Sequence, residues 1–221
     1  MKKLVFLFAF ILIACKESYT ELGPCDQYAD TKIYIDEFGT ITACGNSKVG
    51  DTQLINGISY KVVDEEMLRA MVANDEDVTR LATSKIRNMN ALFYLKDNFN
   101  QDIGNWDTGR VNDMSSMFLG AKSFNQNIGN WKLGNVVTMS SMFYGADAFN
   151  QDISVWGDRN INNYGRTCLV KNMSYMFYEA TEFDQDISTW DVRNVEICHY
   201  FSNRNKNSWT ASEKPNFTEC P

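Results

Sequence analysis

Hydrophobic positions recur at a fixed interval from about residue 86 to near the end of the chain. Four copies of the box F-[ND]-Q-[DN]-I are each followed, three residues after the isoleucine, by a tryptophan. The boxes begin at residues 99, 124, 149 and 183, so their spacings are 25, 25 and 34. The valines that follow are spaced by 25, 34 and 25, which locates a nine-residue insertion in the segment 157–169. Such a period predicts an array of stacked repeats.

Two periodicities alternate within each repeat. Residues of the box alternate between two sides, as in a strand. Met114, Met117, Phe118 and Ala121 instead follow the i, i+3, i+4, i+7 spacing of a short helix. Stacking would bury these side chains, each worth roughly 1.5–3 kcal/mol. The predicted repeat core is Phe99, Ile103, Trp106, Val111, Met114, Phe118, Phe124, Ile128, Trp131, Val136, Met139, Phe143, Phe149, Ile153, Trp156, Val170, Met173, Phe177, Phe183, Ile187, Trp190 and Val195.

The segments on either side of the repeats predict caps. The spacing of Ile33, Ile35 and Ile41 around Phe38-Gly39 predicts a hairpin, and residues 55–63 predict a strand after the turn at Asn56-Gly57. Residues 64–74 predict a helix with Asp64 as its N-cap. We therefore divide the chain into an N-terminal cap at 31–85, repeats at 86–205 and a C-terminal cap at 206–221.

The segment FNQDIGNWDTGRVNDMSSMFLGA and its copies resemble the repeat of BspA-like bacterial surface proteins, many of which are lipoproteins. The resemblance covers about residues 60–220, and the ending PNFTEC is also similar to that family's. It implies an α/β, leucine-rich-repeat-like right-handed solenoid of about four to five coils, with a strand and a short helix in each. It also implies surface adhesion or protein recognition. The insertion at 157–169, which contains Cys168, departs from the family pattern.

The first fifteen residues predict an export signal. Lys2 and Lys3 precede an apolar run, residues 4–14, that is too short to span a bilayer and ends at Cys15. Leu-Ile-Ala-Cys at 12–15 resembles a bacterial lipobox, which implies cleavage after residue 14, acylation of Cys15 and attachment to a membrane. Residues 15–30 would be a polar tether. The predicted location is the bacterial envelope, at the outer membrane or cell surface; the alternative is an ordinary secretory signal with an accidental cysteine.

The net charge and the cysteine content limit which classes of partner, cross-link and cofactor we expect. The chain carries a formal charge of −7, which becomes −9 when residues 1–14 and their two lysines are removed, and this argues against nucleic acid. An exported chain forms disulfides, and the candidate pairs are Cys25 with Cys44 and Cys198 with Cys220. Cys168 is left over. With one histidine and no CxxC motif, we predict neither a metal nor a cofactor.

No residues are arranged for familiar catalysis. Cys198 and His199 are adjacent, but a disulfide is the stronger interpretation of the cysteine, and no GxSxG or HExxH motif is present. Asp102, Asp152 and Asp186, together with Asn127, are either calcium ligands or caps of turns. The tryptophan row is either a core ladder or a platform for carbohydrate. We favour turn caps and a core ladder, and predict no enzyme.

These patterns predict a non-catalytic surface lipoprotein that binds a macromolecular ligand. Two alternatives remain. A spacer of the cell envelope would bind nothing saturably, and a glycan-binding accessory lipoprotein would expose its tryptophans to solvent.

Overall fold

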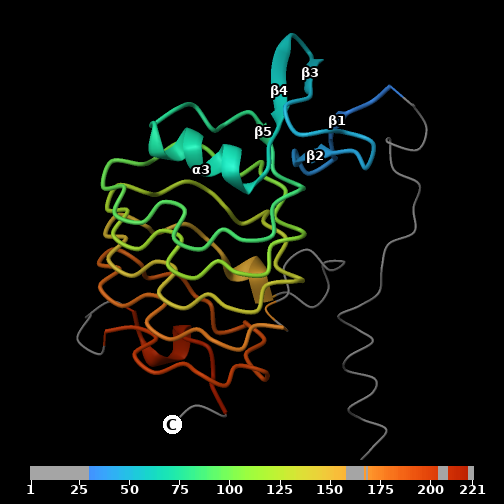
Figure 1. The fold of residues 1–221 in the computed structure, drawn as a ribbon. Coiled ribbons are helices and arrows are strands. Elements are labelled where there is room, and N and C mark those ends of the chain that lie inside the picture. Colours follow the sequence, from blue (N-terminus) through green and yellow to red (C-terminus); the bar gives the residue numbers. More distant parts are fainter. Residues whose placement is uncertain (1–29, 158–166, 168, 204–208, 219–221) are drawn as a thin grey trace, which may run out of the picture.

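The computed structural model describes residues 30–157, 167, 169–203 and 209–218. A stack of repeated turns forms most of the molecule, with strands and one helix gathered at its N-terminal end (Figure 1). The elements in chain order are β1 (Ile33–Ile35), β2 (Ile41–Ala43), β3 (Thr52–Ile55), β4 (Ile58–Val62), α3 (Glu65–Ala73), β5 (Leu81–Ala82) and the 3₁₀ turns η1 (Ser154–Gly157) and η2 (Ala211–Glu213).

Two small sheets form the N-terminal part. β1 and β2 make an antiparallel hairpin, as the spacing of the isoleucines predicts, and Ile33 pairs with Ala43. β3 and β4 pair antiparallel around Asn56 and Gly57, whose φ values of 51° and 80° match the turn that favours this dipeptide. β5 adds to β4 in parallel. The hairpin is joined to the repeats because the Ile41 N–H donates to the Asn105 carbonyl at 2.8 Å.

Helix α3 lies across one end of the stack (Figure 1). The Asp64 carboxylate accepts from the Met67 N–H at 2.9 Å, which caps the helix as predicted. Leu68 and Val72 are buried against the repeats. Glu65, in the first turn of the helix, supplies a carboxylate that accepts from the Arg87 and Asn88 N–H groups. The helix thus covers the apolar side chains of the first repeat and accepts hydrogen bonds from two of its backbone N–H groups.

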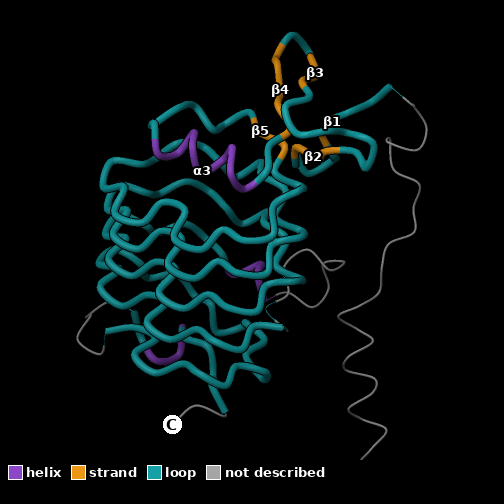
Figure 2. The backbone as a smooth tube through the Cα atoms, in the orientation of Figure 1, coloured by secondary structure: helices purple, strands orange, loops and turns teal. Residues whose placement is uncertain are grey.

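The predicted α/β, leucine-rich-repeat-like right-handed solenoid is wrong. Within the described part of the chain there is one α-helix, one two-stranded sheet and one three-stranded sheet, and all of them lie before residue 83. From there on, the described residues form turns, bends, isolated bridges and two 3₁₀ turns, drawn mainly as loop in Figure 2. This does not fit four to five coils that each hold a strand and a helix.

The predicted helical stretch is a series of turns because its N–H groups bond to the next repeat. Those of Met114, Ser116, Phe118 and Gly120 donate to carbonyls about 25 residues ahead, at 2.7–3.1 Å. An α-helix would need them for carbonyls four residues back. The positive φ values of Ser116 (55°) and Gly120 (71°) also break helical geometry. The i, i+3, i+4, i+7 pattern is therefore correct about burial and wrong about backbone.

The predicted strand is absent because side chains replace its backbone partners. The N–H groups of Asn125 and Asn150 donate to the side-chain oxygens of Asn100 and Asn125, each at 3.0 Å. A β-ladder would pair them with backbone carbonyls. The glutamine beside each asparagine joins the same acceptor, as Gln151 does at 2.9 Å. The amides of Gln126, Gln151 and Gln185 thus bind asparagines of the preceding repeat.

Aromatic side chains form a continuous core through the turns. Parallel single-residue bridges join Asn88, Asp113, Thr138, Asn172 and Ile197 in series, which fixes the register of the layers. Two rows of phenyl rings stack along this direction, with centroids 5.3–5.5 Å apart in one row and 5.8–5.9 Å in the other. The rows are Phe93, Phe118, Phe143 and Phe177, and Phe99, Phe124, Phe149 and Phe183.

Candidate binding surface

The predicted repeat-core residues lie inside the molecule. Phe99 is partly buried against the main cluster, and the other members of the set have at most 4% of their surface exposed. These residues therefore hold the layers together and are not available to a ligand. A binding function has to come from other side chains.

The tryptophan row is part of this core. Trp106, Trp131 and Trp156 have at most 1% of their surface exposed, and Trp190 has 4%. Each indole N–H donates to a backbone carbonyl of the preceding layer, as Trp131 does to Ile103 at 3.1 Å. Buried indoles usually find such a partner. With both ring faces and the N–H occupied, these residues cannot serve as a platform for carbohydrate.

The cysteine predictions divide between described and undescribed parts of the chain. Cys44 and Cys198 are each disulfide-bonded. Their predicted partners Cys25 and Cys220, the predicted lipid site Cys15 and the predicted leftover Cys168 all lie outside the described residues. The disulfide at Cys198 deprives a Cys198-His199 dyad of its thiolate. Nearly all of the insertion 157–169 is also outside the described ranges.

The recurrent acidic residues cap turns. Asp102 accepts from the Gly104 N–H at 3.1 Å, and Asn127, Asp152 and Asp186 each accept from the N–H two residues on in the same way. Hydrogen bonds from the side chain and backbone of Ser188 lower the pKa of Asp186. Within the described ranges, no group of three or more histidine, cysteine or acidic side chains is placed to hold a metal ion. The carboxylates thus have a structural role in the turns.

An aromatic cluster lies on the surface of the last repeats. It consists of Tyr144, Tyr175, Tyr178, His199 and Tyr200, which we call the tyrosine patch. Ring centroids of Tyr144 and Tyr178 are 5.2 Å apart, those of Tyr175 and Tyr200 are 5.0 Å apart, and His199 meets Tyr175 edge-on at 5.5 Å. Tyr200 has 62% of its surface exposed. The cluster is contiguous, and it reaches solvent.

The turn geometry explains why the rings gather there. Tyr175 and Tyr200 have φ values of 57° and 54°, at the repeat position that holds Ser116 and Ser141 in earlier layers with φ of 55° and 56°. Positive φ is costly for a bulky residue. The Tyr175 N–H donates to the His199 carbonyl at 3.1 Å, which brings the two layers and their rings together. Serine adopts the same geometry in the earlier layers, so the backbone does not require an aromatic ring at this position.

The phenol of Tyr144 is held in its neutral form. Partial burial, and then the nearby Glu179 carboxylate and neighbouring tyrosines, raise the pKa of Tyr144. A neutral phenol presents both an apolar ring and a hydroxyl that donates and accepts hydrogen bonds. The surface is therefore suited to contact and hydrogen bonding, not to nucleophilic chemistry.

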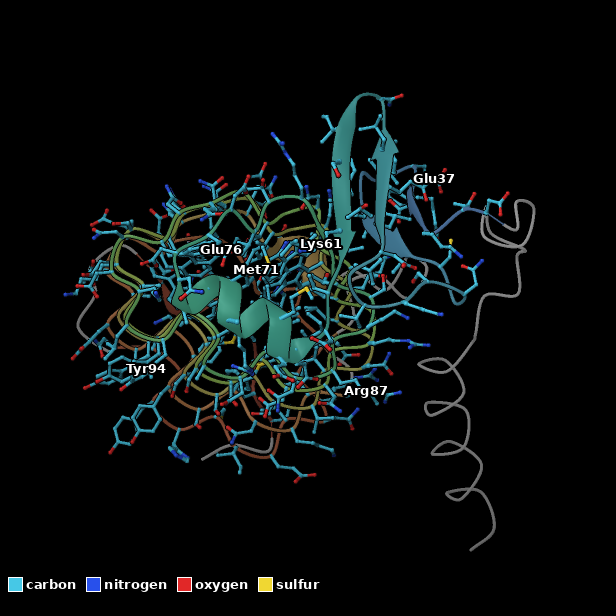
Figure 3. The ribbon with its side chains drawn as sticks, turned by 45° about the horizontal axis from the view of Figure 1, so that its top comes forward. Glu37, Lys61, Met71, Glu76, Arg87 and Tyr94 are labelled. Atoms are coloured by element: carbon cyan, nitrogen blue, oxygen red, sulfur yellow. The ribbon has the colours of Figure 1, made fainter. Side chains whose placement is uncertain are left out.

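A hollow adjoins the patch at the C-terminal end of the stack. It has a volume of about 1030 Å³. Its lining includes Tyr178, His199 and Tyr200 of the patch, and Lys214 and Phe217 of the C-terminal segment. Tyr94, at the opposite end of the repeats, is 50% exposed and lies at the molecule's edge near α3 in Figure 3.

Sequence reasoning missed both the patch and the hollow. Tyr144 and Tyr178 directly follow Phe143 and Phe177, which occupy the same position of the repeat. Tyr175 and Tyr200 occupy another position. Alignment of all layers would show tyrosine replacing serine at one position while a second tyrosine persists nearby. Only the structure shows that the two sets touch, with ring centroids 5.7–6.4 Å apart.

The fold and this surface define a repeat protein with a buried aromatic core and an exposed aromatic patch. A family model described as "Mycoplasma protein of unknown function, DUF285" matches residues 64–168 and 158–214. Together the matches extend over more than half of the 221 residues, so the chain belongs to this family. Neither the curated proteins nor the solved structures include a match. Among the described residues, no helix has the length and apolarity needed to cross a membrane.

Proposed function

We propose that this protein is an exported, lipid-anchored bacterial surface protein that binds a macromolecular partner through the tyrosine patch, without catalysis. The partner is a host matrix protein, the surface of another cell or a sibling protein. The resemblance of the repeat to BspA-like surface proteins supports this role, and the description of the matching family supports a bacterial source.

The observation that carries the proposal is the clustering of Tyr144, Tyr175, Tyr178, His199 and Tyr200 at the surface. Tyrosine is enriched in the centres of protein interfaces, where a rigid ring loses little entropy on contact and its hydroxyl stays hydrogen-bonded. Two of the tyrosines also sit at positions where positive φ disfavours a large side chain. Ser116 and Ser141 adopt the same backbone geometry in earlier layers, so this geometry does not itself select tyrosine.

Export and anchoring rest on the sequence. Lys2 and Lys3, the apolar run that follows and Cys15 support a lipidated N-terminus. Acyl chains on one cysteine, two or three together, are sufficient for stable attachment. The disulfides at Cys44 and Cys198 are in keeping with an oxidising location.

Saturable binding tests the role of the patch. The chain from Lys16 onward is labelled and titrated onto intact cells and onto immobilised matrix proteins. We expect a saturating isotherm, and the double variant Tyr175→Ser/Tyr200→Ser should weaken it by about tenfold, as loss of interface tyrosines commonly does. Serine is chosen because Ser116 and Ser141 hold the same backbone geometry. Tyr94→Ser, which removes an exposed tyrosine outside the patch, is the matched control and should bind normally.

The alternative outcomes of this titration are informative. Uptake that rises linearly without saturation would support a spacer of the envelope and contradict the proposal. Equal weakening by Tyr94→Ser and by the double variant would show that the contact is not confined to the patch.

Lipid attachment needs its own test. In cells fed labelled palmitate, the native chain should carry the label and sediment with membranes, whereas Cys15→Ser should lose both properties. Cys168→Ser is the control for removal of a cysteine as such. Label absent from the native chain would favour an ordinary secretory signal.

A further inference from the structure

We propose that the hollow beside the tyrosine patch binds a single carboxylate that is attached to an apolar or aromatic residue of a peptide, with Lys214 as its counter-ion. The inference rests on the proposed function, because it names the chemistry that a protein partner would present next to the patch.

The charge of its lining is the first feature of the hollow that indicates a ligand. Lys214 is the one lysine, arginine or acidic residue in its described lining, which also includes Tyr200, Phe201, Ser202 and Asn203. The protein as a whole is acidic, with a formal charge of −7. A lone cation in an otherwise uncharged hollow favours an anionic group at that point.

The surroundings of the Lys214 ammonium are the second such feature. Its ammonium lies 4.9 Å from the centroid of the Trp209 ring, and it makes no ion pair with the described residues. Burial lowers its pKa, while the nearby Glu213 carboxylate opposes that change. Glu213 is itself engaged, since it accepts from the Thr210 N–H at 2.7 Å and from the Thr210 hydroxyl at 2.8 Å. The ammonium is partly desolvated, and among the residues that the structure describes it contacts the face of the Trp209 ring.

Four other lysines differ from Lys214 in this respect. Lys96, Lys122, Lys132 and Lys171 each lie 2.7–3.3 Å from a carboxylate oxygen. A carboxylate brought by a ligand would give Lys214 what these lysines already have, in a site where water screens the pair less than at the open surface.

The size and lining of the hollow indicate the rest of the ligand. A volume of about 1030 Å³ is at the upper end of ordinary ligand sites, which hold roughly 300–1,000 Å³. The rings of Tyr178, Phe201 and Phe217 offer apolar contact, and Ser202 and Asn203 offer hydrogen bonds. A polyanion is disfavoured by the charge of the whole protein, whereas one carboxylate is not. A peptide that ends in an apolar residue, or holds an acidic residue beside one, fits these features.

The test compares peptides that differ only in the carboxylate. The chain from Lys16 onward is titrated at pH 7 by calorimetry with acetyl-Leu-Phe, with acetyl-Leu-Phe-amide and with acetyl-Phe-Glu-amide. We expect at least one carboxylate peptide to bind about tenfold more tightly than acetyl-Leu-Phe-amide, as a charge-assisted contact would supply. Preference for acetyl-Leu-Phe identifies a chain terminus as the source of the carboxylate, and preference for acetyl-Phe-Glu-amide identifies an acidic side chain.

Variants locate the contact. Lys214→Met should remove the preference for the carboxylate, Lys214→Arg should keep most of it, and Lys171→Met, at an exposed lysine paired with Glu196, should leave it unchanged. Equal binding of acid and amide, no binding of any peptide, or an undiminished preference in Lys214→Met would overturn the inference. The proposed function fails separately, if Tyr175→Ser/Tyr200→Ser leaves binding to cells and matrix proteins intact.

Discussion

The N-terminal part and the repeats fold by different uses of the backbone. Between residues 30 and 82, backbone hydrogen bonds build a hairpin, a small sheet and one helix. In the repeats, alternate N–H groups leave their own segment and bond to the next layer, as Phe118 does to Met142 at 2.9 Å. The comparison teaches that one hydrophobic periodicity can be buried by a helix or by stacked turns. Which of the two forms depends on where the N–H groups find their acceptors.

The largest expected effect comes from the centre of the repeat core. Phe143 contacts the rings of Phe118, Phe149 and Phe177 at 4.1–5.5 Å, so Phe143→Ala should cost about 3–5 kcal/mol of unfolding free energy. Leu68→Ala in α3, at the end of the stack, should cost about 2–4 kcal/mol. Urea unfolding of both variants measures the difference. A smaller loss for Phe143→Ala than for Leu68→Ala would contradict a core centred on the phenyl rows.

A matched pair of glycines tests the turn geometry of the layers. Gly120 and Gly145 both have positive φ, at 71° and 64°. A Cβ at Gly120 would lie 2.6 Å from the Leu95 side chain, whereas the nearest atoms to one at Gly145 would be 3.9 Å away. Gly145→Ala should therefore cost only the backbone strain, roughly 1–2 kcal/mol, and Gly120→Ala should cost slightly more, because the exposed Leu95 side chain must move aside. Thermal melts of the two variants in parallel decide this, and equal melting temperatures would count against the described packing.

The asparagine acceptors distinguish the two regions more finely. Asn125→Ala leaves the Asn150 N–H and the Gln151 amide without the acceptor they share, at a cost of about 1–3 kcal/mol. Asp64→Ala removes the N-cap of α3 and should cost about 0.5–2 kcal/mol. Amide hydrogen exchange adds the location of each effect. Faster exchange in Asn125→Ala should appear at residue 150, in the next layer, while in Asp64→Ala it should remain within the helix.

The smallest expected effect is on the pH dependence of stability in acid. The pKa of Asp77 is lowered by hydrogen bonds from the side chain and backbone of Thr79, and that of Asp186 by those from Ser188. A folded-state pKa below the unfolded value means that each group stabilises the fold above its ordinary pKa, and this contribution is lost as the pH falls through the lowered value. Asp77→Asn and Asp186→Asn should each melt with a shallower dependence on pH below about 4. An unchanged acid slope in both variants would show that these turns do not depend on the ionised carboxylates.

Part of this structure could be predicted from the sequence. The period of 25, the buried set and the N-cap at Asp64 follow from spacing and residue type, because burial and capping are local or periodic properties. The backbone conformation of the repeats could not be predicted. Met114, Met117 and Phe118 have the same spacing whether the N–H groups of this segment bond four residues back or one layer ahead. The tyrosine patch is also hidden, because Tyr175 and Tyr178 meet Tyr144 and Tyr200 only across layers.

Photo-crosslinking from the surface tests the account most directly. A benzophenone amino acid placed at Tyr178, inside the patch, or at Tyr94, at the far end of the repeats, reports which surface a partner touches on the intact cell. We predict a discrete crosslinked product from position 178 and none from position 94. A product of equal yield from both positions, or from position 94 alone, would contradict recognition through the tyrosine patch.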